Sequence, residues 1–233
     1  MIMDADTEKP GAENTVADVK KNPLLEIENL EVDIPTANGT LHAVRDVSLT
    51  LNRGEALGIV GESGSGKSMS ALALLGLLPA KAQRRASTLR LGRHDLLSMS
   101  DGEIAKKVSG DRITMIFQEP MTSLNPVYSI GRQLTETMTL HCKSSEAQAR
   151  ERAIYLLGKV GLSAAESRLA QYPHQLSGGQ RQRVMIAMAL MNEPELIIAD
   201  EPTTALDVTV QAQILRLLGD LQREFNMAMI LIS

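Results

Sequence analysis

The sequence has 233 residues, of which 43% are hydrophobic and 22% charged, and its net charge is −4. This is the composition of a globular protein with room for one large domain or two small ones. The acidic balance and the 2% aromatic content argue against a nucleic-acid-binding surface, which needs basic patches and rings for stacking. Cys142 is the only cysteine, which excludes a disulfide framework and a thiol metal cluster within these residues.

Residues 1–22 are polar and carry mixed charges, and we interpret them as a disordered tail. They contain no apolar core of the signal-peptide kind. Elsewhere no stretch approaches the roughly 20 apolar residues that a membrane-spanning helix needs. We therefore expect the chain to be cytoplasmic, and any link to a membrane to run through a partner.

The first predicted elements are β-strands. Residues 24–34 alternate apolar and polar side chains, residues 43–51 follow a similar pattern, and Asn38-Gly39 between them favours a hairpin. The run "ALGIV", residues 56–60, is continuously apolar and predicts a strand buried on both faces. Arg84 and Arg85 are interpreted as a solvated turn.

The remaining elements alternate between helices and strands. We expect helices from Lys67 to about Leu78, over 146–160 and over 208–225, and strands over 112–117, 196–199 and 227–233. Gly76 and Pro79 are expected to end the first of these helices. The alternation predicts an α/β fold with a largely parallel central sheet.

The stretch "GESGSGKS" matches the pattern of a phosphate-binding loop, and it lies between a predicted strand and a predicted helix. Its glycines let the backbone wrap closely around a phosphate, while the helix N-terminus adds positive potential. The alternative is a plain glycine-rich turn before a helix. The candidate nucleotide-binding residues are Gly61, Ser63, Gly64, Ser65, Gly66, Lys67 and Ser68. Lys67 would reach the β- and γ-phosphates, and the Ser68 hydroxyl would bind Mg²⁺.

An acidic pair, Asp200 and Glu201, ends the apolar run "LIIA". Ligands of open α/β sheets bind at strand ends, so Asp200 is a candidate Mg²⁺ ligand and Glu201 a candidate general base for an attacking water. Gln118 follows another predicted strand, and its amide could contact the metal or the water. The alternative for the acids is a solvated turn before Pro202.

A second anion site is predicted at "SGG", residues 177–179, just before a helical run. Ser177 is a good N-cap residue, and the two glycines leave backbone N–H groups uncovered. The alternative is a simple N-cap after a loop.

Together these motifs resemble those of the ATP-binding subunits of ABC transporters, over roughly residues 24–233. "GESGSGKS" resembles their Walker A motif, "LSGGQ" their signature motif and "LIIADEP" their Walker B motif with its catalytic glutamate. Residues 205–207, "ALD", resemble the D-loop, and Gln118 falls at the Q-loop position.

Two longer stretches narrow the resemblance. "FQEPMTSLNP", residues 117–126, and "YPHQLSGGQRQRV", residues 172–184, are similar to the peptide and nickel uptake branch, which contains the oligopeptide and dipeptide permease ATPases.

The resemblance implies a P-loop NTPase (RecA-like) core with an antiparallel β subdomain and an α-helical subdomain over about 119–185, within a nucleotide-binding domain of residues 23–233. ATP and Mg²⁺ are the implied ligands. In this family two domains pair head to tail, so that the signature of one completes the Walker A site of the other. The residues implied to contact nucleotide in this way are Ser177, Gly178, Gly179, Gln180 and Asp207.

The implied activity is ATP hydrolysis that energises uptake of peptides or a related small solute. The implied partners are a second ABC ATPase domain, identical or related, and integral membrane permease subunits, with an extracytoplasmic solute-binding protein engaged indirectly and no nucleic acid. The implied location is peripheral, at the cytoplasmic face of the inner membrane.

Two features depart from the family. The position where the family stacks adenine on an aromatic ring is Ile34, and no aromatic residue precedes Phe117, which leaves Ile34 or His42 to contact the base. The family's switch histidine follows the strand that "MILIS", residues 229–233, resembles, and here the chain ends at Ser233. We expect a truncated chain of this kind to bind ATP and to hydrolyse it poorly.

Two other functions stay open at this stage. One is an ABC ATPase that acts on DNA or ribosomes, although the long coiled-coil insertions and basic linkers that mark such proteins are absent from the sequence. The other is a nucleotide-binding module without catalysis, which the missing histidine allows.

Overall fold

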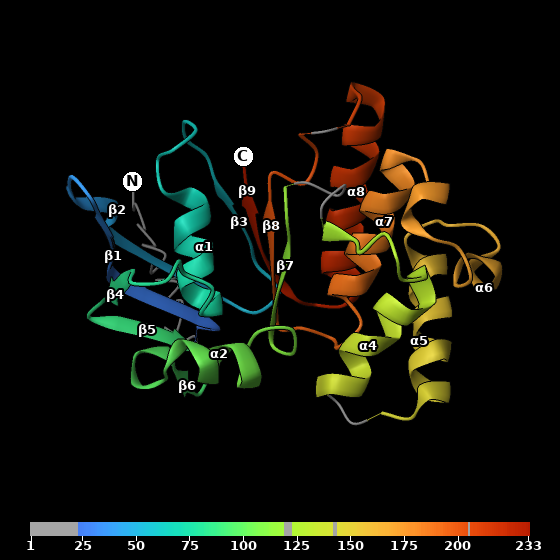
Figure 1. The fold of residues 1–233 in the computed structure, drawn as a ribbon, viewed down its shortest axis with the longest axis horizontal. Coiled ribbons are helices and arrows are strands. Elements are labelled where there is room, and N and C mark those ends of the chain that lie inside the picture. Colours follow the sequence, from blue (N-terminus) through green and yellow to red (C-terminus); the bar gives the residue numbers. More distant parts are fainter. Residues whose placement is uncertain (1–22, 119–122, 142–143, 205) are drawn as a thin grey trace, which may run out of the picture.

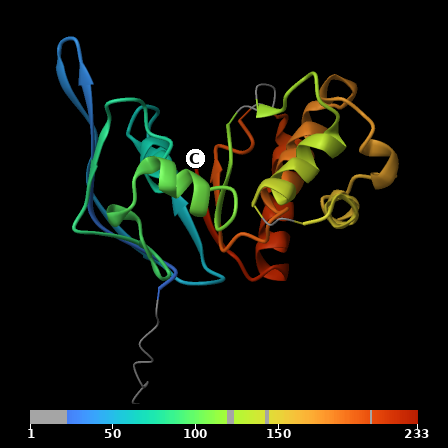
Figure 2. The ribbon, with the colours of Figure 1, turned by 60° about the horizontal axis from the view of Figure 1, so that its bottom comes forward.

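A computed structural model describes residues 23–118, 123–141, 144–204 and 206–233. Figure 1 shows an antiparallel sheet on one side, a parallel sheet in the middle and a group of helices on the other side. Helix α1 (Lys67–Leu75) lies between the two sheets. Figure 2 shows the same division from a second direction.

The central sheet is parallel throughout. Its strands run in the order β3 (Ala56–Ile59), β9 (Ala228–Ile232), β8 (Leu196–Asp200) and β7 (Ile113–Ile116). Strand β8 is buried at every position, as its apolar sequence predicts for a strand with neighbours on both sides. The predicted α/β fold with a largely parallel sheet is confirmed.

One strand differs from its prediction. Strand β3 is not buried on both faces, because its residues alternate between exposed and half-buried. Within the described ranges it pairs with β9 and lies at the edge of the sheet. An apolar run signals burial only when neighbouring strands cover it, and the order of strands in a sheet is not encoded locally.

The second sheet is antiparallel and contains β1 (Leu25–Thr36) and β2 (Gly39–Leu51), joined by the predicted hairpin. Short strands extend it: β4 (Gln83–Arg85) and β5 (Thr88–Leu91) pair with β1, and β6 (His94–Asp95) pairs with β5. This sheet is the antiparallel β subdomain that the family resemblance implies.

Arg84 of β4 is not part of a solvated turn, since only 9% of its side chain is exposed. Its guanidinium donates hydrogen bonds to the carbonyls of Ala73, Leu96 and Met99. The guanidinium also lies 3.5 Å from the carboxylate of Asp101. Burial lowers the pKa of Arg84. The arginine therefore ties the end of α1 to the segment that follows β6.

Local sequence signals mark the end of α1 and the start of α5 (Glu146–Lys159). Helix α1 ends at Gly76, which has a left-handed φ of 64°. Ser145 and Gln148 form a capping box at the start of α5. The other helical elements in the described residues are η1 (Leu96–Ser98), α2 (Asp101–Lys107), α4 (Ile130–His141), α6 (Ala165–Arg168), η2 (Pro173–Gln175), α7 (Gly178–Ala189) and α8 (Val208–Glu224).

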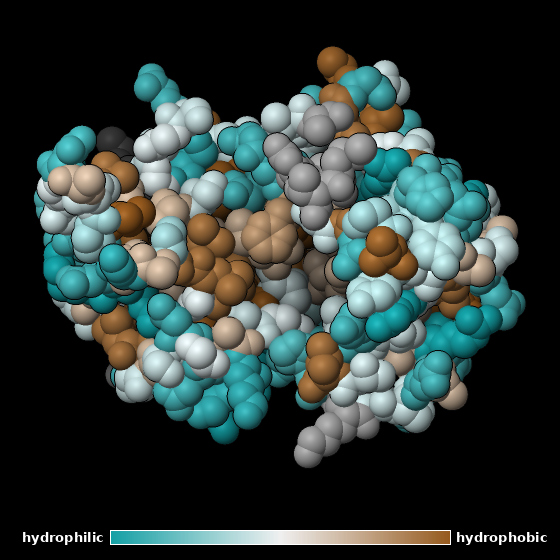
Figure 3. Space-filling model, in the orientation of Figure 1, coloured by the Kyte–Doolittle hydropathy of each residue, from teal (hydrophilic) through white to brown (hydrophobic). Residues whose placement is uncertain are grey.

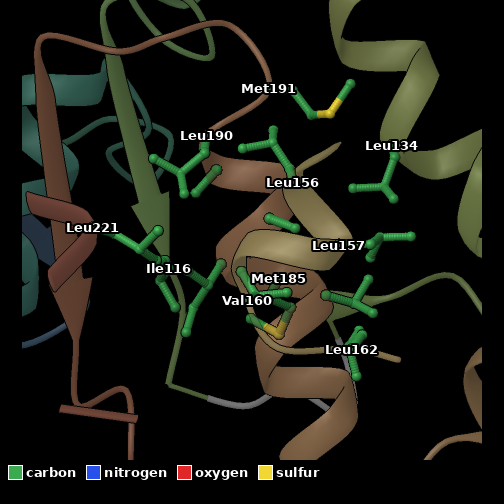
Figure 4. Packing of buried hydrophobic residues seen from close by; sticks show 14 of the residues in the cluster. Ile116, Leu134, Leu156, Leu157, Val160, Leu162, Met185, Leu190, Met191 and Leu221 are labelled. Atoms are coloured by element: carbon green, nitrogen blue, oxygen red, sulfur yellow. The ribbon is translucent and has the colours of Figure 1, made fainter. Parts of the chain in front are cut away.

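Two hydrophobic clusters hold these layers together. One packs α1 between β1 and the inner face of the parallel sheet. The other packs α4, α5, α7 and α8 against the opposite face, and Figure 4 shows its centre around Leu156, Leu157 and Met185. Burial of each such leucine contributes about 2 kcal/mol to folding stability. The parallel sheet is therefore held firmly against α1 on one face and against α4, α5, α7 and α8 on the other.

Candidate nucleotide site

The phosphate-loop candidate connects β3 to α1 and is largely exposed to solvent. Gly64 and Gly66 have φ values of 81° and 91°, a conformation that glycine adopts without strain. A Cβ on Gly66 would lie 2.1 Å from the carbonyl oxygen of Ala43. Only glycine therefore fits at this point, where the loop touches the antiparallel sheet.

Lys67 and Ser68 begin α1, and no acidic residue occupies the first turn of this helix. The Lys67 ammonium donates to the carbonyls of Gly61 at 2.5 Å and Glu62 at 3.0 Å, so its charge lies over the loop. The uncapped helix N-terminus adds partial positive charge. This combination suits a phosphate group.

The two acids differ in their surroundings. Asp200 ends β8 and is only 6% exposed, and its Oδ1 has no hydrogen-bond partner in the described part of the chain. A buried carboxylate oxygen without a partner requires an explanation, and a cation or a cation-bound water supplies one. Asp200 and the Ser68 hydroxyl are oxygen donors of the kind that Mg²⁺ prefers.

Glu201 has a φ of 43°, which is uncommon for a residue other than glycine and marks local strain. Its backbone N–H donates to the Ile232 carbonyl at 3.0 Å. Its carboxylate accepts hydrogen bonds from the Gln118 amide at 2.6 Å and from the Thr204 hydroxyl at 3.0 Å. Gln118 and Glu201 are 83 positions apart in sequence, and the parallel strands β7 and β8 bring them together at one edge of the sheet.

The phosphate loop, Gln118 and Glu201 line one cavity of about 350 Å³. It is lined by Ile34, Leu41, His42 and Ala43 from the antiparallel sheet, by Ser63 to Met69 from the loop and α1, and by Gln118 and Glu201. The predicted loop residues other than Gly61, and two of the three predicted strand-end residues, thus line one cavity, while Asp200 lies buried directly before Glu201.

The signature segment lies elsewhere and does not line this cavity. The Ser177 hydroxyl accepts from the Gln180 N–H at 3.3 Å, and the Gln180 side chain accepts from the Ser177 N–H at 3.0 Å, as in a capping box. A Cβ on Gly179 would lie 3.1 Å from Val210, so the start of α7 packs against the start of α8. Asp207 caps α8 by accepting from the Val210 N–H at 3.0 Å.

Two interactions near the cavity were missed from the sequence. Thr204 supports the Glu201 carboxylate, although its position in "DEPTT" could have suggested a role. His42 donates to Asp33 at 2.6 Å, and Arg85 donates to the other Asp33 oxygen at 2.5 Å. The hydrogen bond from His42, together with Arg85, lowers the pKa of Asp33 against the opposing effect of burial. These partners lie on different strands, so sequence spacing gives no signal for them.

Comparison with known proteins decides the family. The family model described as "ABC transporter" matches residues 44–204. This chain belongs to the ABC transporter family. The match spans the phosphate loop, Gln118, the signature segment and the acidic pair.

The relatives include oligopeptide transport ATP-binding proteins. The one from Haemophilus influenzae is 51% identical over 212 residues, and the one from Escherichia coli K12 is 50% identical over 218 residues. These matches cover 91% and 94% of this chain, but 65% and 64% of the relatives. The chain therefore spans just under two thirds of the length of these proteins.

A solved structure shows the same fold. The dimeric, post-hydrolysis ATP-binding cassette MJ0796, bound to ADP and phosphate, gives a TM-score of 0.77 at 28% identity, over 90% of this chain and 87% of that chain. The P-loop NTPase core with an antiparallel sheet and a helical part is thereby confirmed. In the described part of this chain, no helix has the length and apolar character needed to cross a bilayer.

Proposed function

We propose that this protein binds ATP with Mg²⁺ and hydrolyses it as the ATP-binding subunit of an importer for peptides or a related small solute. The observation that carries the proposal is the hydrogen bond from Gln118 to Glu201 at the mouth of the phosphate loop. Both residues line the same cavity as the loop, so a loop that suits phosphates and a carboxylate that suits a general base face one space. The relatives are oligopeptide transport ATP-binding proteins, and this supports the solute class.

Each residue of the site has a proposed role. The loop N–H groups and Lys67 bind the phosphates, and Ser68 and Asp200 hold Mg²⁺, which neutralises phosphate charge when bound. Glu201 accepts a proton from the attacking water, a role worth about 10²–10⁴ in rate. Gln118 and Thr204 hold the Glu201 carboxylate in place.

The signature segment is proposed to act on the nucleotide of a partner. Ser177, Gly178, Gly179 and Gln180 lie outside the cavity, as does Asp207, and Ser177, Gly178 and Asp207 are exposed. A head-to-tail dimer with a second copy or a related chain would bring them to ATP. The dimeric form of MJ0796 supports this arrangement. ATP then favours the closed dimer because both subunits contact it.

A separate groove is proposed to receive the membrane permease. This groove, of about 240 Å³, runs between the end of α1, β7 and helices α4 and α7. It is lined by Leu75, Leu77, Ile113, Met115, Phe117, Met185 and Met188, among others. Figure 3 shows hydrophobic residues gathered over α1 and β7 near the middle of this face. Phe117 precedes Gln118, so a permease segment seated here could influence the ATP site.

The proposal is tested by ATP turnover and assembly together. Mg-ATP hydrolysis is measured for the purified protein, including any residues that flank this chain, with and without the permease subunits in vesicles. We expect turnover and co-purification with membrane proteins. Binding of ATP without turnover would indicate a non-catalytic module, and co-purification with DNA or ribosomes would indicate the non-transport class.

A further inference from the structure

An unpaired amide is buried in α7. Gln182 is 1% exposed, and neither its side-chain oxygen nor its side-chain nitrogen has a hydrogen-bond partner. In the part of the chain that the structure describes, no other buried side chain leaves two polar atoms unpaired. An amide with one acceptor and two donors is costly to bury in this way, and such a group in a native structure requires an explanation.

The register of α7 places Gln182 on the face that meets the start of α8. A helix turns by about 100° per residue, so Gln182 lies between Gly178 and Gly179 in angle around the helix axis, one turn further on. A Cβ on Gly178 would lie 3.7 Å from Leu206, and a Cβ on Gly179 would lie 3.1 Å from Val210. Figure 1 shows α7 and α8 side by side. The amide therefore lies between α7 and the segment that leads into α8.

The connecting turn, residues 202–204 and 206–207 in the described chain, contains an acceptor for this amide. The Gln211 side chain donates to the carbonyls of Thr203 at 3.2 Å and Leu206 at 3.0 Å. A carbonyl oxygen has two lone pairs, so the Leu206 carbonyl can accept a second bond. The Leu206 side chain, in contrast, presents only carbon atoms to Gln182.

Both helices that enclose Gln182 begin at residues proposed to contact a partner's nucleotide. Ser177 precedes α7 and Asp207 precedes α8, and both residues are exposed. A partner's ATP that binds both residues acts on the junction between the two helix starts. The connecting turn is also tied to the acid pair, because the Thr204 hydroxyl donates to the Glu201 carboxylate at 3.0 Å.

We propose that Gln182 is a latch: its amide is unpaired in the free chain and donates to the Leu206 carbonyl when an ATP-bound dimer draws the starts of α7 and α8 together. A bond made only in the dimer favours the dimer, since an equilibrium shifts only through interactions that differ between its two states. Gln182 is thus a positioning residue, which fixes the connecting turn and, through Thr204, the Glu201 carboxylate. This inference rests on the proposed head-to-tail dimer and adds a residue that touches no nucleotide.

Gln182→Met tests the latch, because methionine fills a similar space without a polar amide. The purified protein, including any residues that flank this chain, carries Glu201→Gln to slow hydrolysis. We expect an unfolding free energy without ATP equal to or above that of the parent, because an unpaired buried amide is removed. ATP affinity of the monomer should be unchanged, and ATP-dependent dimerisation should weaken about tenfold.

Urea titration, calorimetry and sedimentation measure these three quantities. Gln182→Leu repeats the test with a second apolar side chain, and circular dichroism verifies that each variant is folded.

Gln222 of α8 provides the matched control. It is also buried, at 8% exposed, but its side-chain nitrogen donates to the carbonyls of Gly54 at 2.7 Å and Met227 at 3.0 Å. Gln222→Met should therefore lower the unfolding free energy and leave dimerisation unchanged. The two buried glutamines are expected to give opposite results.

Two results would overturn the latch while leaving the proposed function intact. One is dimerisation of Gln182→Met as strong as that of the parent. The other is a loss of unfolding free energy as large as in Gln222→Met, which would show that the amide already has partners in the free chain, a buried water included. If the parent binds ATP without dimerising, the proposed head-to-tail arrangement fails and the latch fails with it.

Discussion

The phosphate loop and the signature segment both place glycines at the N-terminus of a helix, but their polar groups are used differently. At the loop, α1 has no side-chain cap, and Lys67 lies over the backbone of the loop. At the signature segment, Ser177 and Gln180 already bond to each other's backbone in a capping box. The first region shares a cavity with Gln118 and Glu201, whereas the second does not. We propose that one region holds a ligand within the chain and that the other is a preformed surface for a partner.

The largest effect is expected for Glu201→Gln. Loss of the general base should reduce ATP turnover by about 10²–10⁴, while nucleotide affinity stays within a few-fold of the parent, because the loop is unchanged. Turnover and binding are measured separately. Glu193→Gln is the matched control, since Glu193 also has a left-handed φ, of 53°. Undiminished turnover in Glu201→Gln would refute the assignment of the base.

Gly66→Ala should damage the first region alone. The added Cβ collides with the Ala43 carbonyl, and the φ of 91° is unfavourable for alanine. We expect ATP affinity to fall tenfold or more and unfolding free energy to drop by about 1–3 kcal/mol, measured by calorimetry and urea titration. Gly92→Ala separates the two causes, because Gly92 has a φ of 52° with open space around its Cβ. Equal losses of ATP affinity in both variants would contradict the role of the close contact.

Ser177→Ala should affect the second region. The lost cap costs about 1 kcal/mol, and ATP-dependent dimerisation should weaken about tenfold while ATP binding to the monomer is unchanged. Ser145→Ala removes the equivalent cap from α5 and controls for the stability loss. Sedimentation measures the dimer. Equal dimerisation of the two variants would show that Ser177 acts only as a cap.

The smallest expected effect is on the pH dependence of folding stability, and it distinguishes the capping box of α2 from that of α7. The backbone and side chain of Ser100, together with Lys107, lower the Glu103 pKa from 4.5 to about 2 at the start of α2. A carboxylate with a depressed pKa stabilises the fold above its unfolded pKa, and this contribution is lost as the pH falls from about 4.5 toward 2. The α7 cap uses Gln180 and does not titrate. In Glu103→Gln, urea titrations across this range should show a shallower pH dependence. An unchanged slope would contradict the α2 assignment.

Much of the first region was predictable because its signals are local. The glycine pattern of residues 61–68 predicted the loop, and the apolar run of β8 predicted a strand that ends at the acid pair. Gly76 predicted the end of α1. Features that depend on distant pairing were not predictable. The edge position of β3 depends on strand order, and the burial of Arg84 depends on carbonyls of Ala73, Leu96 and Met99.

The geometry around Glu201 shows the same limit. The sequence indicated that Gln118 and Glu201 both follow strands and that the Gln118 amide could contact the metal or the water, but it did not predict the hydrogen bond between the two side chains. The left-handed φ of Glu201 and its hydrogen bond from Thr204 depend on how the turn after β8 packs against Ile232, and no local pattern encodes that contact.

Disulfide crosslinking tests most directly whether the phosphate loop of one chain and the signature segment of another contact the same ATP. Two forms of the protein, each carrying Glu201→Gln and Cys142→Ser, receive either Ser63→Cys or Ser177→Cys and are mixed with ATP under oxidising conditions. The account predicts a crosslinked species of twice the monomer mass, formed only when ATP and both forms are present. A third form carries both introduced cysteines. A crosslink within single chains of this form, with none between the two mixed forms, would contradict the account.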